Sequence, residues 1–570
     1  MKVFEEKIKG AIAKVTKLKK KEITLREPFG TATKFGDITF PCFDLAKKKK
    51  KKKNPKEIAK EIANKLKKKL PNEIDKVEAV GGYINFFISK DSFTKNTIEK
   101  ILKEKNKYGC LGLKGKALIE HTSINPNASP HVGRVRNAII GDILSRLLKF
   151  HGYKTDIHYY VNDVSKQMAL LILGSKGDES FDDLLNLYVF MSDEMKKKPE
   201  IEKKVFEILR KVEDKDKEII GKLNKLVRTA IEGQSEILNK LGIFYDSFDY
   251  ESVYLEKGKL KKILEQLKKT KRLKKDVQDR YILDQSDMKW EFEKEMKSPV
   301  LVLTRSNGTG LYPLRDIAYT IDKLKSAPVN IIVLGEDQKL YFKQLSATLE
   351  LLGYRAPRVV HYSFILLKTK KGAKKMSTRR GEVILLSDFI KEAIRKARQE
   401  IKKRGREKNV DIDTVSEAIG IGAVRYTIAK VEMNKDITFN WEEALNFEGN
   451  TSPYLQYTHA RASSIIKKLG KEKLANPLFN KVHEKEYALA KELGKFPKIV
   501  SDALEGLKPH LLCNYTYTLA HTFNDFYENC PVIQTEDKEI KARRVMLVQT
   551  TIIVLKIVLN LLGLPALEAM

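Results

Sequence analysis

The segment Ile119–Asn137 constrains the fold of this chain more than any other part of the sequence. The run KALIEHTS ends in a polar loop rich in Pro, Asn and Ser, and the chain then enters the amphipathic run RNAIIGDILSRLLKF. This pattern predicts a strand, a loop and a long helix that begins near His131-Val132-Gly133. Free backbone N–H groups and the positive end of the helix dipole favour an anion at such a turn. We therefore expect a phosphate site there, with Gly133 leaving the backbone accessible and His131 donating a hydrogen bond.

A second motif, the basic segment Lys374–Gly381 (KKMSTRRG), follows the apolar run VVHYSFILL, which is typical of a buried strand. Two interpretations remain open. The segment could be a solvated basic loop before a helix that begins near Ser387. Alternatively, it is a mobile cationic loop that closes over a triphosphate and stabilises charge on the leaving pyrophosphate.

Strand and helix signals alternate between these motifs, from about residue 113 to 403, which predicts a doubly wound parallel sheet. A long, basic and mostly helical insertion, about residues 179–296, separates the second and third strand signals. We therefore expect three domains, at 1–112, 113–403 and 404–570. The expected strands of the middle domain are KALIEHT, KTDIHYYV, VLVLTRS, NIIVLG and VVHYSFILL.

The flanking regions differ in class. The first 112 residues combine helical stretches with strand signals at Gly36–Phe40 and in GGYINFFIS, and they include the lysine run Lys47–Lys53. That run is typical of a solvated face, with contact to an RNA backbone as the alternative. The region after residue 404 is predicted to be all-helical. Its most apolar segment, Val545–Leu564, is interrupted by polar residues and is predicted to be a buried bundle helix rather than a membrane span.

Composition limits the classes of partner and of site. Lys and Arg number 109 against 75 Asp and Glu, giving a net charge of +34. This excess fits a polyanionic partner such as nucleic acid, although a general lysine bias explains it equally well. The four cysteines lie far apart and form no CxxC pair, which argues against a zinc ribbon or a disulfide framework and favours a reducing cytoplasm.

The motifs together resemble one family. SINPN before the HVG turn, YYVND at Tyr159–Asp163, GLYPLRDIAY at Gly310–Tyr319 and KMSTRRG are similar to arginyl-tRNA synthetases, which are class I aminoacyl-tRNA synthetases. The archaeal or eukaryotic branch is the most similar. The resemblance covers nearly the whole chain. It implies an N-terminal α+β tRNA-binding domain, a Rossmann-type catalytic domain and a C-terminal all-α anticodon-binding domain.

The implied activity is that of an arginine–tRNA ligase. Arginine would react with ATP to give arginyl-adenylate and pyrophosphate, and would then pass to the 2′-hydroxyl of the terminal adenosine of its tRNA. The expected partners are ATP with Mg²⁺, L-arginine and the tRNA for arginine, without a structural metal or a membrane. We expect a cytoplasmic monomer. The alternative is a catalytically inactive tRNA-binding paralogue.

The resemblance also assigns residues to three sites. For the guanidinium, residue chemistry agrees, because Tyr312 and Asp316 share one face of a starting helix and supply a phenol and a carboxylate. An acid that favours the helix dipole is the alternative for Asp316. The ATP-binding and catalytic residues would be His131, Gly133, Arg134, Lys375, Met376, Ser377 and Arg379; the arginine-binding residues Glu120, Asn125, Tyr312, Asp316 and Gln338; and the tRNA-binding residues Asn85, Tyr454, Tyr457, His459 and Arg461.

Two departures from the family pattern concern charge. Arg134 replaces the second histidine of the HxGH motif, and Thr378 replaces the final lysine of KMSK. Members without that lysine often carry a compensating one just before HxGH, but the matching residue here is Ala128. Another cation must then supply the charge. Arg379 is the residue we expect to do so, with Arg134 and Lys374 as the other candidates.

Overall fold

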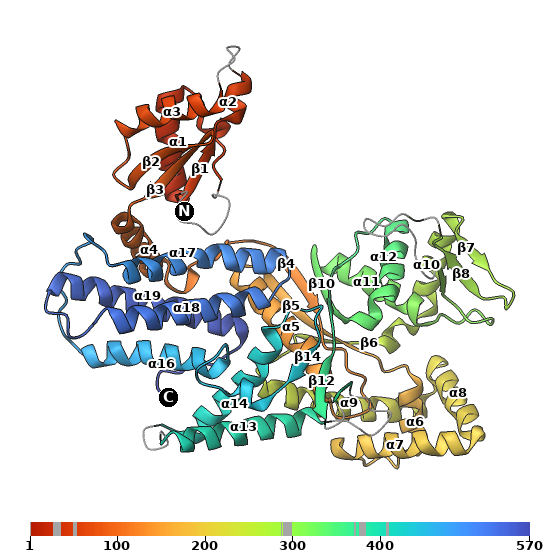
Figure 1. Ribbon diagram of the computed structural model, residues 1–570. Coiled ribbons are helices and arrows are strands. Elements are labelled where there is room, and N and C mark those ends of the chain that lie inside the picture. The colour runs from red at the N-terminus through yellow and green to blue at the C-terminus, as the bar shows by residue number, and fades with distance from the viewer. Residues whose placement is uncertain are drawn as a thin grey trace. The chain divides into compact units, whose positions relative to one another are not determined.

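The computed structural model describes residues 2–26, 36–48, 54–286, 288, 299–369, 372–375, 384–405 and 410–570. The chain forms two compact units. The first contains residues 1–108, 461–497 and 518–556, and the second contains residues 109–460, 498–517 and 557–570. Figure 1 labels their helices and strands.

The N-terminal part of the first unit is built on a three-stranded antiparallel sheet in the order β1-β3-β2. Gly81 and Gly82, both with positive φ, form the tight turn between β2 and β3, which is the conformation that two-residue hairpins require. The strands and helices predicted for this region are confirmed. The elements are α1 (Lys2–Thr16), η1 (Lys20–Glu22), β1 (Ile38–Pro41), α2 (Phe43–Lys48), α3 (Pro55–Lys67), β2 (Ile74–Val80), β3 (Tyr83–Ile88), α4 (Lys90–Glu104) and η3 (Lys105–Lys107).

The C-terminal region is helical, as predicted, except for the short strand β14 (Ile437–Phe439), whose three residues pair with β12 (Ile365–Thr369) and give too short a pattern to be predicted from sequence. Parts of its four long helices belong to each unit. They are α16 (Ser452–Leu469), α17 (Glu484–Glu505), α18 (His510–Asn529) and α19 (Lys538–Leu562). By length and composition alone, α19 could cross a membrane, but 67% of its most apolar window is buried inside the structure. It is therefore the buried bundle helix that the sequence predicts.

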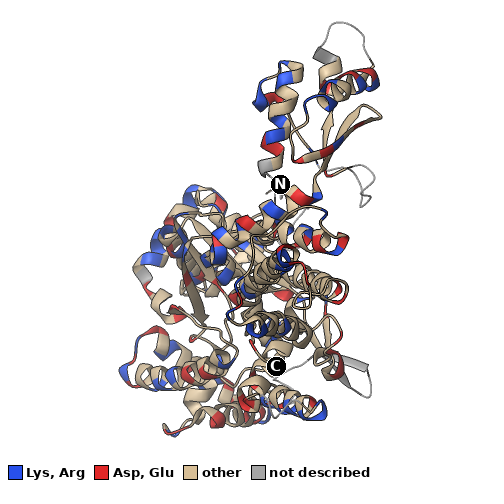
Figure 2. Ribbon diagram, turned by 90° about the vertical axis from the view of Figure 1, so that its left-hand side faces the viewer, with Lys and Arg blue, Asp and Glu red and all other residues tan. Residues whose placement is uncertain are grey.

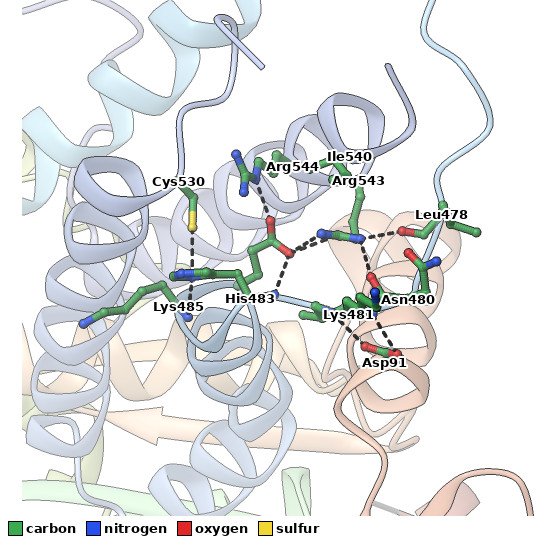
Figure 3. Close-up of polar contacts among 12 residues, drawn as sticks. Asp91, Leu478, Asn480, Lys481, His483, Lys485, Cys530, Ile540, Arg543 and Arg544 are labelled. Atoms are coloured by element: carbon green, nitrogen blue, oxygen red, sulfur yellow. Dashed lines mark hydrogen bonds and ion pairs between the residues drawn. The ribbon is translucent and has the colours of Figure 1, made fainter. Parts of the chain in front are cut away.

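A buried carboxylate joins these helices within the first unit (Figure 3). Glu486 on α17 is fully buried and accepts hydrogen bonds from Arg543 Nε at 2.9 Å and Arg544 Nε at 2.6 Å, both on α19. Arg543 also donates to the carbonyl of Leu478 at 2.6 Å. The segment before α17 is held in addition by Asp91 of α4, whose carboxylate accepts from the backbone N–H groups of residues 481 and 482 at 3.1 and 2.9 Å. Buried charges of this kind persist because each is paired and hydrogen-bonded.

The second unit is organised around a five-stranded parallel sheet in the order β11-β10-β4-β5-β6 (Figure 1). The chain moves outward from β4 to β6 and then returns to the other side of β4, so the predicted doubly wound fold is confirmed. The strands are β4 (Lys116–Glu120), β5 (Lys154–Val161), β6 (Ser247–Tyr250), β10 (Val329–Gly335) and β11 (Arg358–Tyr362).

Helix α5 (Val132–Phe150) lies against this sheet and is buried along most of its length. Gly141 allows the close approach, because a Cβ atom there would lie 2.1 Å from the ring of His121. The remaining helices of the unit are α6 (Lys166–Gly174), α7 (Phe181–Lys197), α8 (Pro199–Glu213), α9 (Lys217–Lys240), η4 (Glu251–Leu255), α10 (Lys257–Lys269), α11 (Tyr312–Ser326), η5 (Glu336–Gln338), α12 (Lys339–Leu351), α13 (Leu386–Lys403), α14 (Ile412–Ala429) and α15 (Trp441–Ala444).

Two small sheets complete the unit. The first, in the order β7-β8-β9, contains Leu273–Lys275, Tyr281–Asp284 and Val300–Val302 and is antiparallel. The second, in the order β13-β12-β14, contains Gly372–Lys375, Ile365–Thr369 and Ile437–Phe439.

One predicted strand of the parallel sheet was wrong. The run VLVLTRS contributes β9 to the small antiparallel sheet, and the outer parallel strand is β6, which lies inside the segment predicted as a helical insertion. A short buried apolar run has the same sequence pattern in parallel and antiparallel sheets. The residues of β6, SFDY, are partly exposed and polar at an edge of the sheet, so they give a weak strand signal.

Candidate active site

The carboxyl ends of β4 and β10 meet at the point where the strand order reverses, which is where sheets of this class bind ligands. Asn137 of α5 joins the two strands there. Its Oδ1 accepts from the N–H of Thr122 at 2.7 Å, and its Nδ2 donates to the carbonyl of Val333 at 3.0 Å. Thr122 and Ser123 adopt positive φ of 80° and 44°, a strained conformation for residues other than glycine. The start of α5 is thus fixed against a tightly turned loop.

His131 is the N-cap residue of α5, with Gly133 in the first turn and the guanidinium of Arg134 exposed beside it. Burial, together with the nearby charge of Arg134, lowers the pKa of His131 to about 4. The imidazole is therefore neutral at pH 7, and its buried Nδ1 has no hydrogen-bond partner among the described residues. A neutral donor at a helix N-terminus can contact a phosphate oxygen without titrating near neutral pH.

The segment after the KMS motif lies directly against this turn. The N–H of Val132 donates to the carbonyl of Ile384 at 3.0 Å, and the N–H of Leu386 donates to the carbonyl of Pro130 at 2.8 Å. Lys375 is the last residue of β13, where its backbone pairs with Leu366. The other predicted residues of the motif, Met376, Ser377, Thr378 and Arg379, lie outside the described residues.

Arg136 ties α5 to the segments that lead into β12 and β14 of the second small sheet. Its guanidinium is fully buried and donates to the carbonyls of Ser363, Lys435 and Glu432 at 2.9, 2.7 and 2.9 Å. Ser363 precedes β12, and the other two carbonyls precede β14. The sequence analysis missed Arg136, because an arginine in an amphipathic helix carries no sign that it will be buried.

Asp316 lies in the first turns of α11, on the acidic side of the site. Its Oδ1 accepts from the phenol of Tyr160 at 3.1 Å and its Oδ2 from the phenol of Tyr341 at 2.5 Å. Burial raises the pKa of Asp316 to about 6, and the hydrogen bond from Tyr341 opposes that shift. The side chains that the structure describes form no ion pair with this carboxylate. The predicted partner Tyr312 is 51% exposed, and its ring centroid lies 5.1 Å from that of Tyr341.

Glu120, at the end of β4, is arranged differently. Its carboxylate is buried and forms an ion pair with Lys323 of α11, whose ammonium also lies 4.2 Å from the centroid of the Tyr319 ring. Glu120 therefore has a cation of the protein beside it, whereas Asp316 is held by two neutral phenols. Of these two acids, only Asp316 has no ion-pair partner among the described side chains, so its carboxylate can pair with a cationic ligand.

Two more acids come from the end of β6. Asp249 Oδ2 lies 2.6 Å from His158 Nδ1 and accepts from the Tyr319 hydroxyl at 2.7 Å. Glu251 accepts from Arg315 Nε at 2.6 Å, and its burial raises its pKa to about 7. Glu120, Asp249, Glu251 and Asp316 thus form an acid cluster at the carboxyl ends of β4 and β6 and the start of α11. Such a cluster favours a cationic ligand over an anionic one.

Two other residues predicted to bind arginine lie at the same edge of the sheet. The side chain of Asn125, in the loop after β4, donates to Gln167 Oε1 at 2.7 Å. Gln338 is exposed at the end of η5, directly after β10. The acid cluster also contacts Tyr160, Tyr341 and Lys323, which the sequence analysis did not single out. Tyr160 lies within the YYVND motif, so only that residue carried a sequence signal.

The residues predicted to bind tRNA have mixed surroundings. Asn85 on β3 is 4% exposed, and its Oδ1 accepts from the Thr39 hydroxyl at 2.7 Å. His459 on α16 is buried, with Nδ1 2.7 Å from the carbonyl of Leu567. Arg461 Nη1 donates to Asn524 Oδ1 at 2.8 Å. The remaining two, Tyr454 and Tyr457, are partly exposed on α16.

Three family models match successive parts of the chain. They are described as "tRNA synthetases class I (R), catalytic domain", over residues 97–441, "DALR anticodon binding domain", over 455–570, and "Arginyl tRNA synthetase N terminal domain", over 2–88. The first covers more than half of the sequence. The chain belongs to the arginyl-tRNA synthetase family.

Individual members of this family agree with the assignment. The arginine–tRNA ligase of Methanocaldococcus jannaschii is 41% identical over 537 residues, covering 92% of this chain and 91% of the relative. That of Methanosarcina mazei is 40% identical, with 87% of each chain covered. The structure of arginyl-tRNA synthetase from Thermus thermophilus matches with a TM-score of 0.79 at 26% identity, covering 99% of this chain and 100% of that one. The family prediction is thereby confirmed, and the alternative of an inactive paralogue finds no support in these comparisons.

Proposed function

We propose that this member of the arginyl-tRNA synthetase family ligates arginine to its tRNA. The arginine carboxylate attacks the α-phosphorus of ATP, a new P–O bond forms, and the bond to the β-phosphate breaks to release pyrophosphate. The 2′-hydroxyl of the terminal adenosine of the tRNA then attacks the activated carbonyl, and AMP leaves. Positioning and charge stabilisation supply most of the catalysis in such displacements.

The observation that carries the proposal is the set of contacts around the Asp316 carboxylate. Two phenols donate to its two oxygens, and it forms no ion pair with the described side chains. The nearby charge of Lys323 lowers its pKa, but that ammonium is paired with Glu120. A guanidinium is a planar donor fork that pairs with a carboxylate in this geometry. We infer that Asp316 reads the arginine side chain, with Tyr312 beside it. Asn125, Gln338 and Glu120 would complete the arginine site, and Glu120 would share its carboxylate with Lys323.

ATP would bind at the start of α5. His131 and the backbone at Gly133 would contact its phosphates, while Lys375, Met376 and Ser377 would approach from the other side of the site. The charge of the missing KMSK lysine would come from Arg379, with Arg134 as the exposed alternative at the helix start. Backbone hydrogen bonds between residues 130–132 and 384–386 support this arrangement, because they hold the segment that follows the KMS motif against the HVG turn.

Mg²⁺ would enter the site on the phosphates of ATP. Among the residues that the structure describes, no group of three or more His, Cys, Asp or Glu side chains could hold a metal ion.

The tRNA would bind a strongly basic protein. Figure 2 shows that Lys and Arg are distributed over many helices rather than confined to one. We propose Tyr454, Tyr457, His459 and Arg461 on α16 as tRNA contacts, and Asn85 only if its buried side chain becomes accessible. A cytoplasmic monomer remains our expectation.

Amino-acid-dependent ATP–pyrophosphate exchange tests the proposal. The purified chain is assayed with and without tRNA, using arginine, lysine, cysteine and methionine. We expect exchange with arginine alone among these four. Tight tRNA binding without exchange for any amino acid would instead establish an inactive paralogue.

A further inference from the structure

The loop that precedes the HVG turn is held from outside the parallel sheet. Helix α9 belongs to a group of helices, α6 to α9, inserted between β5 and β6 (Figure 1). Its inward face is apolar except at Gln234, which is fully buried among residues such as Ile231 and Leu238. A buried amide is retained when all its donors and acceptors are used.

Both N–H groups and the carbonyl oxygen of the Gln234 side chain form hydrogen bonds. Its Nε2 donates to the carbonyl of Asn125 at 3.0 Å and to the carbonyl of Ala128 at 2.9 Å. Its Oε1 accepts from the hydroxyl of Tyr159 at 2.7 Å, and that hydroxyl also accepts from the N–H of Ile124 at 3.1 Å. The amide therefore spans the loop from residue 124 to 128, two residues before the turn into α5.

Other contacts fix the helix and the same loop. Gly233 lies against the ring of Phe181 on α7 so closely that a Cβ atom would come within 2.2 Å of it. The side chain of Asn125 donates to Gln167 on α6, and Gln167 donates in turn to the Tyr188 hydroxyl on α7 at 3.3 Å. The inserted helices thus hold both the backbone and the side chain of Asn125.

We propose that Gln234 is a positioning residue for arginine, through which the inserted helices set the geometry of the Asn125–Ala128 loop. The inference rests on the proposed function, because it requires that Asn125 contacts arginine. It assigns a role to the insertion that does not depend on tRNA contact. Gln234 itself does not touch the substrate.

The Gln234→Glu variant tests this role with almost no change in shape. A carboxylate cannot donate to the two carbonyls and would repel them at about 3 Å. We expect the KM for arginine in the exchange reaction, measured with saturating tRNA, to rise about tenfold, with the KM for ATP within about twofold of wild type. A loss of folded protein would lower kcat and leave both KM values unchanged. A rise in the KM for arginine alone therefore indicates an effect on positioning rather than on stability.

Two further variants make the test decisive. Gln266→Glu, on the exposed face of α10, introduces the same charge in the same unit and should leave both KM values unchanged. Tyr159→Phe removes the hydroxyl that contacts both Gln234 and the Ile124 backbone of the same loop, and should raise the KM for arginine about threefold. If Gln234→Glu does not fold, the KM values of Tyr159→Phe test whether this hydrogen-bond network positions the loop. Wild-type KM values in either folded variant, or equal increases for ATP and arginine, would overturn the inference. A wild-type chain without arginine-dependent exchange would contradict the proposed function instead.

Discussion

The acid cluster and the start of α5 lie at the same edge of the parallel sheet but are prepared in different ways. In the cluster, Asp316 is oriented by two phenols, and Glu120 is paired with a buried lysine. At the start of α5, His131 is neutral with a free buried nitrogen, and Arg134 is exposed. The group that would read arginine is thus already fixed by the protein, whereas the groups for the triphosphate still have open hydrogen-bonding positions.

This difference is what the two tasks require. Discrimination among amino acids needs a rigid partner whose desolvation has already been compensated within the protein. Stabilising a leaving pyrophosphate needs donors that meet charge only as it develops. Substitutions in the acid cluster should therefore alter kcat/KM for arginine, and substitutions at the start of α5 should alter kcat for the reaction with ATP.

The largest effect is expected for Asp316→Asn. The amide keeps the shape but removes the charge, so a bound guanidinium would be buried without a counter-ion, which costs about 3–5 kcal/mol. We expect kcat/KM for arginine in the exchange assay to fall by about 10²–10³-fold, with little change in the KM for ATP. Asp322→Asn, on the same helix but paired at the surface with Lys259, is the matched control and should retain activity. Similar losses of kcat/KM for arginine in both variants would show that the charge of Asp316 has no special role in binding arginine.

Lys323→Met should act on stability. It leaves Glu120 buried without its cation, and the free energy of unfolding should fall by about 3 kcal/mol in urea denaturation. The double variant Lys323→Met with Glu120→Gln removes both charges and should recover part of this loss. A single variant as stable as wild type would show that the two side chains are not an interdependent pair.

His131→Ala tests the other region. Loss of one donor to developing charge should lower kcat for exchange by about 10²-fold, with the KM for arginine nearly unchanged. Steady-state kinetics with each substrate varied would measure this. If His131→Ala instead raises the KM for arginine, the assignment of His131 to the ATP site is contradicted.

The smallest expected effect is on the pH dependence of kcat/KM for arginine. Burial raises the pKa of Asp316 to about 6, and the carboxylate must be ionised to pair with arginine. The kcat/KM for arginine should therefore be constant above that pH and should fall about tenfold per unit below it. His131, with a pKa of about 4, remains neutral throughout this range. Tyr341→Phe removes a hydrogen bond that lowers the pKa of Asp316, so the inflection should move to higher pH. An inflection that does not move would remove Asp316 as its origin.

Sequence patterns were sufficient for much of the fold but for less of the site. Strands β4 and β10 are short, mostly apolar runs bounded by turns, β5 has alternating buried positions, and α5 has a helical period, so all four were predicted from local pattern. The partly polar edge strand β6 was missed, because its role in the sheet depends on β5 rather than on its own residues.

The same distinction applies to individual residues. Asp316 and Tyr312 share one helical turn, which the sequence shows directly. Tyr341, Lys323 and Gln234 reach the site only through tertiary packing. Their partners lie 25 residues away for Tyr341, 203 for Lys323 and 75 to 109 for Gln234. No local periodicity reports such contacts, so positioning residues are the part of a site that a single sequence conceals.

The central claim is that the charge of Asp316 reads the guanidinium of arginine. Exchange kinetics with arginine and with citrulline, its uncharged urea analogue, test it most directly when wild type and Asp316→Asn are compared in the presence of tRNA. The account predicts that wild type prefers arginine by at least about 10²-fold and that the variant loses most of this preference. A variant that still prefers arginine as strongly as wild type would contradict the claim.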